Sequence, residues 1–131
     1  MLDRLDIHVE VAPVEYSELS GKPTGETSAE IRRRVEAARK IQNDRYRGTG
    51  ISCNARLTPA LMNKYCHLTD DADRILKAAF EVMGMSARSY DRILKIARTV
   101  ADLDHSDYIG SAHISQAIQF RSLDRKYWNE L

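Results

Sequence analysis

The sequence predicts a mostly α-helical protein: a small bundle of about five helices preceded by one isolated β-strand. Helix-capping residues stand before segments whose apolar residues recur every three to four positions. Only one segment alternates strictly between apolar and polar residues. A chain of 131 residues with 43% hydrophobic and 30% charged residues is typical of a single globular domain rather than a disordered chain.

The strand is predicted over residues 5–11, "LDIHVEV", where Leu5, Ile7, Val9 and Val11 share one side and Asp6, His8 and Glu10 the other. A lone strand cannot satisfy its own backbone hydrogen bonds, so its partner strands are expected outside this bundle. Proline and glycine residues then indicate a linker over residues 13–27.

The first helix is predicted over residues 28–47, ending at Gly48, because Thr27 and Glu30 form a capping box in "TSAE". Its buried stripe is expected to be Ile31, Val35, Ala38 and either Ile41 or Gln42. The pair Thr58-Pro59 predicts the start of a short second helix that runs to about Cys66.

Three more helices are predicted towards the C-terminus. Thr69 caps the third, whose first turn is acidic, and Gly84 ends it. Ser86 caps the fourth, over about residues 87–103, and Ser111 starts the fifth. The predicted buried stripe of the third helix is Ala72, Ile75, Leu76, Ala79, Phe80 and Met83, and that of the fourth is Tyr90, Ile93, Leu94, Ala97, Val100 and Ala101. The stripe of the fifth helix is Ile114, Ala117, Ile118 and Arg121. Tyr127 and Trp128 are expected to close the bundle.

The net charge of +1 is unevenly distributed along the chain. Residues 1–27 hold two cations and six acids, a balance of −4, whereas residues 28–47 hold seven cations and three acids, a balance of +4. The basic helix is therefore a candidate phosphate-backbone contact through Arg32, Arg33, Arg39 and Lys40. The alternative is a solvated face supported by Arg32–Glu36 and Glu36–Lys40 pairs, since no aromatic residues interleave with the cations.

Arg88 is a second candidate, because it stands in the first turn of the fourth helix, where the helix dipole disfavours a cation. An anion bound there would meet backbone N–H groups, the dipole and a guanidinium. The alternative is that Arg88 pairs with Asp91 or Asp73, or points to water. The cysteines and histidines lack metal-ligand spacing, so no metal site is expected.

The chain contains no phosphate-binding loop, acidic strand motif or nucleophile elbow, so no enzymatic activity is expected of it alone. No apolar run is long enough to span a membrane, and no signal peptide is apparent. A cytoplasmic location without a membrane partner is therefore expected. The two cysteines are expected to be free thiols.

Several segments together resemble the C-terminal part of magnesium-chelatase-like AAA+ ATPases, in the ComM/YifB competence-protein family. They are "LDRLDIHVEV", "GETSAEIRRRVEAARKIQ", "NARL", "MGMSARSYDRILKIARTVADL" and "HISQAIQFRSLDR". The resemblance implies that residues 1–12 are the last strand of a truncated ATPase core, 13–27 a linker and 28–131 a helical lid. It implies that Arg88 is the sensor-two arginine, that Ser86 and Arg88 contact nucleotide, and that Arg4 is an arginine finger.

The same resemblance implies ATP and Mg²⁺ as cofactors of a longer protein, with none bound to this chain alone. It implies an upstream ATPase core as partner, a homo-oligomeric ring that is usually a hexamer, and a DNA motor active in branch migration during transformation. Two alternatives stay open: a stand-alone DNA-binding module that uses the basic helix 28–47, and a protein-interaction bundle without a ligand.

Overall fold

The computed structural model describes Ile7 and residues 25–120, and this part of the chain is mostly helical. Its elements are α2 (Ser28–Arg45), the 3₁₀ helix η2 (Asn54–Arg56), α3 (Pro59–Tyr65), α4 (Asp70–Met83), α5 (Ala87–Leu103) and α6 (Ser111–Gln119). The predicted fold class, a mostly α bundle of about five helices, is confirmed for these residues. The predicted strand 5–11, except Ile7, most of the linker, Arg121, Tyr127 and Trp128 lie outside the described residues.

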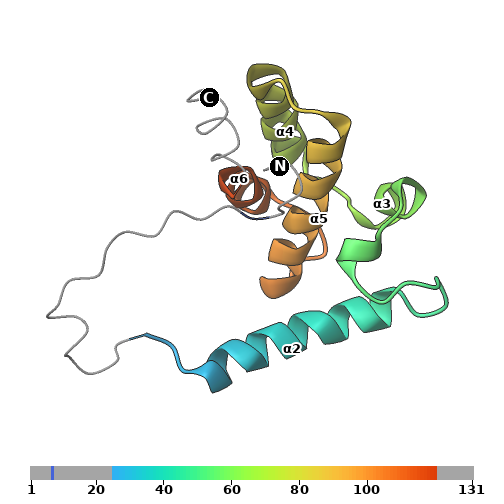
Figure 1. Cartoon of the computed structure of the whole chain (residues 1–131), viewed down its shortest axis with the longest axis vertical. Coiled ribbons are helices and arrows are strands. Elements are labelled where there is room, and N and C mark those ends of the chain that lie inside the picture. Colours follow the sequence, from blue (N-terminus) through green and yellow to red (C-terminus); the bar gives the residue numbers. More distant parts are fainter. Residues whose placement is uncertain (1–6, 8–24, 121–131) are drawn as a thin grey trace, which may run out of the picture.

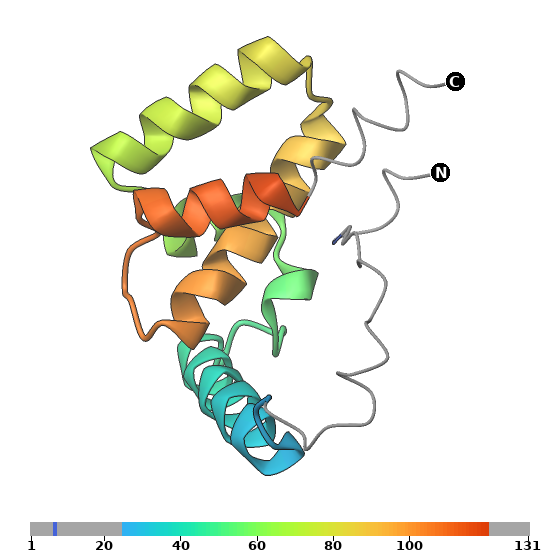
Figure 2. The same cartoon turned by 90° about the vertical axis from the view of Figure 1, so that its left-hand side faces the viewer.

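Helix α5 is the centre of the bundle (Figure 1). It packs against α6 and α2, while α4 packs against α6. Helices α4 and α2 lie at opposite ends of the bundle in both views (Figures 1 and 2). The core is built around α5 residues and their neighbours, of which the fully buried members include Leu76, Ile93, Ala97, Ala101, Ile109, Ile114 and Ala117.

Side-chain caps fix where the helices begin. Thr27 accepts a hydrogen bond from the Glu30 amide at 3.2 Å, and its own amide donates to the Glu30 carboxylate at 3.3 Å. The hydroxyls of Thr58 and Thr69 each cap a helix with one bond, accepting from the amides of Leu61 in α3 and Ala72 in α4. Each cap satisfies a first-turn N–H that has no partner inside the helix. The starts predicted for these helices are therefore confirmed to the residue.

Helix α2 departs from its prediction at its C-terminal end and in its buried stripe. It stops at Arg45 rather than Arg47, because the Tyr46 side chain turns into the core and is 1% exposed. In its first half, Ile31 and Val35 are each 45% exposed, so the predicted buried stripe is wrong there. Only Ala38 and Gln42 are buried, because the first half of α2 extends beyond α5 (Figure 2).

A second departure concerns Phe80, which the periodicity of α4 predicts to be buried. It is 39% exposed, and its ring meets the ring of Tyr90 edge-on with 5.9 Å between centroids. The α4–α5 turn at Gly84, whose φ is +59°, brings these two rings together at one end of the bundle. An edge-to-face pair is favourable even when it is partly exposed.

Candidate functional site

The N-terminus of α5 carries the sharpest sequence-predicted site. Ser86 caps the helix: its hydroxyl accepts a hydrogen bond from the Ser89 amide at 3.1 Å. Arg88 is the second residue of the helix and is exposed. Within the described residues no protein group accepts from the Ala87 amide, which therefore keeps a donor at the helix end. The structure thus places Ser86 and Arg88 together, as the sequence predicts.

The electrostatics of this helix end differ from those of α4. Three aspartates, Asp70, Asp71 and Asp73, stand in the first turn of α4 and complement its dipole. The first turn of α5 has no acidic residue and carries Arg88 instead. An anion bound at this end would meet a favourable helix dipole, whereas α4 already has aspartates of its own there.

A buried charge network holds α5 in place, and sequence periodicity did not reveal it. The side chain of Asp102 is 0% exposed and forms ion pairs with Arg45 of α2 and with Arg98, the latter at 3.2 Å. The amide group of Asn54 donates to Asp102 at 2.9 Å and to Thr99 at 3.0 Å. Helix α2, η2 and α5 therefore meet at one carboxylate.

Arg98 extends the network to the end of α3 and to the loop between α5 and α6. Its guanidinium is 1% exposed and donates to the backbone carbonyls of Asp107 at 2.8 Å, Ser106 at 2.5 Å and Tyr65 at 3.3 Å. The one available sequence signal was the i, i+4 spacing of Arg98 and Asp102 beside the apolar stripe. That spacing is also common on solvated faces, so it does not distinguish a buried pair.

Burial and pairing shift the pKa values of groups around this network. Burial disfavours the charged form of Arg45, but hydrogen bonding and attraction to Asp102 prevail, and the pKa of Arg45 is raised. Burial raises the pKa of Tyr46, whose hydroxyl donates to Asn54. Burial also raises the pKa of the Cys66 thiol to about 11, so this thiol is protonated at neutral pH.

The second sequence-predicted site is the basic face of α2. Arg32, Arg33, Arg39 and Lys40 are all exposed, and within the described residues none of them forms an ion pair. The predicted alternative, an Arg32–Glu36 and Glu36–Lys40 ladder, is therefore not formed in this part of the chain. At 100° per residue the four cations span an arc of about 120°, opposite the side that buries Ala38 and Gln42.

The remaining predicted candidates give no site in the described part of the chain. Cys53 and Cys66 are free and half-buried. Among the described residues, no three His, Cys, Asp or Glu side chains cluster closely enough to hold a metal ion. His113 instead caps the start of α6, since its Nδ1 accepts from the Gly110 amide at 2.9 Å and its Nε2 lies 2.8 Å from Asp104.

No helix in the described ranges combines the length and apolarity that crossing a membrane requires. Arg4 lies outside these ranges.

Comparison with known proteins shows which family this chain belongs to. Residues 25–121 match the family described as magnesium chelatase, subunit ChlI C-terminal. The chain belongs to the magnesium chelatase ChlI C-terminal family. The matched region includes Ser86, Arg88, the basic face of α2 and the Asp102 network. Arg4 and Ile7 lie before its first residue.

Curated relatives of this family member match nearly its entire length. It is 37% identical over 127 residues to protein YifB of Salmonella typhimurium and 35% identical over 126 residues to YifB of Escherichia coli. It is 35% identical over 125 residues to the competence protein ComM of Haemophilus influenzae. Each match covers 95% of this chain, and the chain spans 24% of the length of each relative.

Proposed function

We propose that this chain is the helical lid of an AAA+ ATPase and that Arg88 reads the terminal phosphate of bound ATP. The observation that carries the proposal is the α5 N-terminus, where a serine cap, an exposed arginine and a first turn without acids coincide. Membership of the ChlI C-terminal family and similarity to YifB and ComM support it. The activity belongs to a protein longer than this chain, in which the lid joins an ATPase core.

The residues at this helix end fit a triphosphate. The Ala87 amide is an available donor, the helix dipole favours negative charge, and the Arg88 guanidinium adds a full positive charge two residues after the cap. ATP with Mg²⁺, when bound, supplies the phosphoryl group for transfer to water. Arg88 stabilises the negative charge that develops on that group, and Ser86 holds the first turn in the geometry that presents it.

The experiment on the chain itself is a titration with inorganic triphosphate, followed by amide NMR shifts. We expect shifts at Ala87, Arg88 and Ser89, and little change at the first turn of α4, whose aspartates repel an anion. Arg88→Ala should abolish the shifts, whereas the matched control Arg74→Ala, another exposed arginine near a helix N-terminus, should keep them. Equal shifts at both helix ends would contradict a specific site.

The experiment on the ATPase measures turnover in the longer protein that carries this chain. Arg88→Ala should lower turnover about 10²-fold, the typical loss when one preorganised charge-stabilising donor is removed. The turnover of the Arg88→Lys protein should lie between those of the unmodified and the Arg88→Ala proteins, because lysine keeps the positive charge but lacks the planar guanidinium. Unchanged turnover in a folded Arg88→Ala protein would refute the assignment. Arg4 is proposed as the arginine finger that acts on a neighbouring subunit of the homo-oligomer.

A second candidate function, DNA contact by the basic face of α2, has its own supporting observation. Arg32, Arg33, Arg39 and Lys40 share the face of α2 that points away from its buried residues Ala38 and Gln42, and within the described residues no acid pairs with them. Phosphate-backbone binding needs such unneutralised cations on one surface. ComM, a relative of this chain, is named as a competence protein, which is compatible with a DNA motor in transformation.

A further inference from the structure

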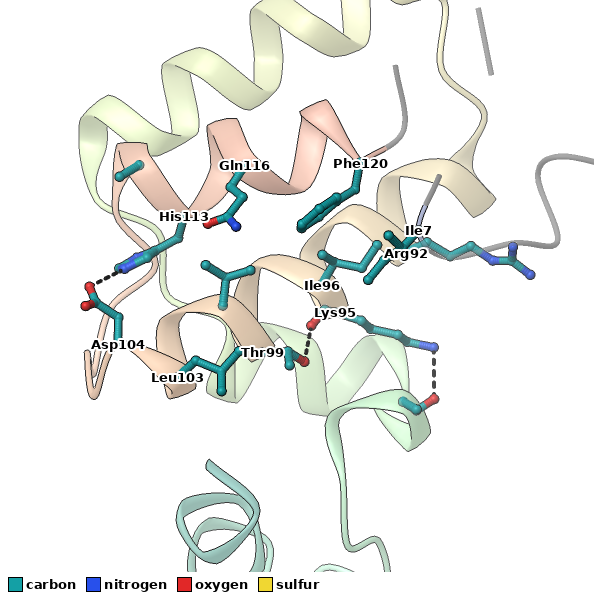
Figure 3. A pocket seen from close by; sticks show the side chains of 13 residues that line it. Ile7, Arg92, Lys95, Ile96, Thr99, Leu103, Asp104, His113, Gln116 and Phe120 are labelled. Carbon is teal, nitrogen blue, oxygen red and sulfur yellow. Dashed lines mark hydrogen bonds and ion pairs between the residues drawn. The ribbon is translucent and has the colours of Figure 1, made fainter. Parts of the chain in front are cut away.

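A broad groove runs along α5 and α6, on a face that neither the Arg88 site nor the basic face of α2 uses. Its volume is about 870 Å³. The apolar part of its wall comes mainly from Ile96, Val100 and Leu103 of α5 and from Phe120 at the end of α6 (Figure 3). Arg92, Lys95, Asp104, His113 and Gln116 supply its polar edge.

One residue of the N-terminal part of the chain already stands at this groove. Ile7 lines it and lies beside Ile96 and Arg92 in Figure 3. Ile7 is nevertheless 51% exposed, and Leu103 on the groove wall is 43% exposed. The groove is therefore still open after Ile7 is counted as part of its wall. Contiguous apolar surface of this kind is costly to leave in water and marks a place where another segment packs.

The sequence around Ile7 has the chemistry to fill this space. Leu5 and Val9 share the apolar side of the predicted strand with Ile7, and Asp6 and Glu10 occupy the other side. Residues 5–11 thus carry two acids and no Lys or Arg. At the groove, Arg92 and Lys95 lie at the end where Ile7 stands, and Asp104 lies at the opposite end beside His113 (Figure 3). The apolar side of the segment therefore suits the groove wall, and the net negative charge of the segment is opposite to the charge of Arg92 and Lys95 at the same end.

We infer that the groove between α5 and α6 binds residues 5–11 of this same chain, with Ile7 as the anchor and Leu5 and Val9 beside it. The contact fastens α5 to the segment that precedes the linker. Because Ile96, Val100 and Leu103 belong to the same helix as Arg88, this contact ties the position of the α5 N-terminus to residues 5–11. The inference stands on the groove and on Ile7, and it holds whether or not Arg88 binds a phosphate.

The direct test is methyl NMR on the 131-residue chain. With isoleucine, leucine and valine methyl groups labelled, we expect nuclear Overhauser contacts from the Ile7 δ-methyl to methyl groups of Ile96, Val100 or Leu103. A sample that mixes labelled and unlabelled chains distinguishes contacts within one chain from contacts between two chains. An isotope-filtered experiment on that sample detects only contacts between chains, so contacts within one chain give no signal. Contacts between chains, contacts from Trp128 in place of Ile7, or unfolded-like shifts for Ile7 would each overturn the inference.

Matched variants test the same point without assigning every contact. Ile7→Asp should move the Val100 and Leu103 methyl resonances, because a carboxylate cannot remain in the apolar groove. Ile31→Asp is the control, since Ile31 is a comparably exposed isoleucine (45%) on α2, outside the groove. Val9→Asp should act as Ile7→Asp does. If Ile7→Asp and Val9→Asp both leave the groove resonances in place while the helical circular dichroism is unchanged, or if Ile31→Asp moves them equally, the inference is overturned.

Discussion

Arg45 and Asp102 form a two-pronged ion pair that joins α2 to α5. One nitrogen of the guanidinium donates to Oδ2 of the carboxylate at 3.0 Å, and the other donates to Oδ1. The carboxylate is fully buried, and Arg98 and Asn54 share its oxygens. This one side chain connects the helix that carries the basic face with the helix that begins at Arg88.

The first prediction concerns this carboxylate. Asp102→Ala should lower the free energy of unfolding by about 3 to 5 kcal/mol, because it leaves two arginines partly or fully buried without their counter-charge. The measurement is urea denaturation followed by circular dichroism. Asp71→Ala is the control, since Asp71 pairs with Arg74 on the surface, and its loss should cost about 0.5 kcal/mol or less. Similar costs for the two variants would show that the network is not a stabilising centre.

The second prediction concerns the turn between α4 and α5. Gly84 has a φ of +59°, and a Cβ added there would meet no atom within 4 Å. The cost of Gly84→Ala is therefore conformational alone, about 1 to 2 kcal/mol. Gly25→Ala, at a position with a negative φ and equally open space, should have almost no effect. Thermal denaturation of the two variants separates these outcomes, and equal stability would exclude a left-handed requirement at position 84.

The third prediction concerns alkaline pH. The pKa of Cys66 is raised from 9 to about 11 in the folded chain, so above pH 9 the unfolded chain loses this proton while the folded chain keeps it. The unfolded state then binds fewer protons, and stability falls as pH rises from about 9 to about 11. Burial also raises the pKa values of Tyr46 and Tyr90, which act in the same direction at higher pH.

Urea denaturation between pH 8 and 11 measures this dependence. Cys66→Ala should flatten the decline over the lower part of that range, while leaving the contribution of the two tyrosines. A Cys53→Ser protein offers an independent readout, because its only thiol is then Cys66. Its alkylation rate should keep rising with pH until about pH 11, where the thiol titrates. A plateau at pH 9 would contradict the raised pKa.

The fourth prediction concerns the basic face of α2. If this face contacts DNA, replacing Arg32, Arg33, Arg39 and Lys40 with glutamine should weaken DNA binding and reduce the slope of log K against log salt by up to about 4. The control replaces four other exposed cations, Arg56, Lys64, Arg74 and Lys77, which lie outside α2. Binding by fluorescence anisotropy at several salt concentrations gives both slopes. Identical slopes would assign the interaction to net charge rather than to this face.

The helix starts could be predicted from the sequence because each depends on residues within one turn. The Thr27–Glu30 capping box, Thr58 before Pro59, and Ser86 before Ala87 are local arrangements, and a hydrogen bond across three residues does not depend on the rest of the fold. For the same reason, the placement of Arg88 beside a cap was predictable, and so was the exposed basic face of α2.

Only the tertiary structure decided which side chains of each helix become buried and which distant residues they contact. The sequence by itself determined a mostly helical bundle and the positions of its helix starts. It did not determine that Asp102 and Arg98 are buried while Ile31, Val35 and Phe80 are exposed. Burial depends on contacts between residues far apart in the chain, such as Arg45 with Asp102, and local periodicity carries no information about which distant partner a side chain meets.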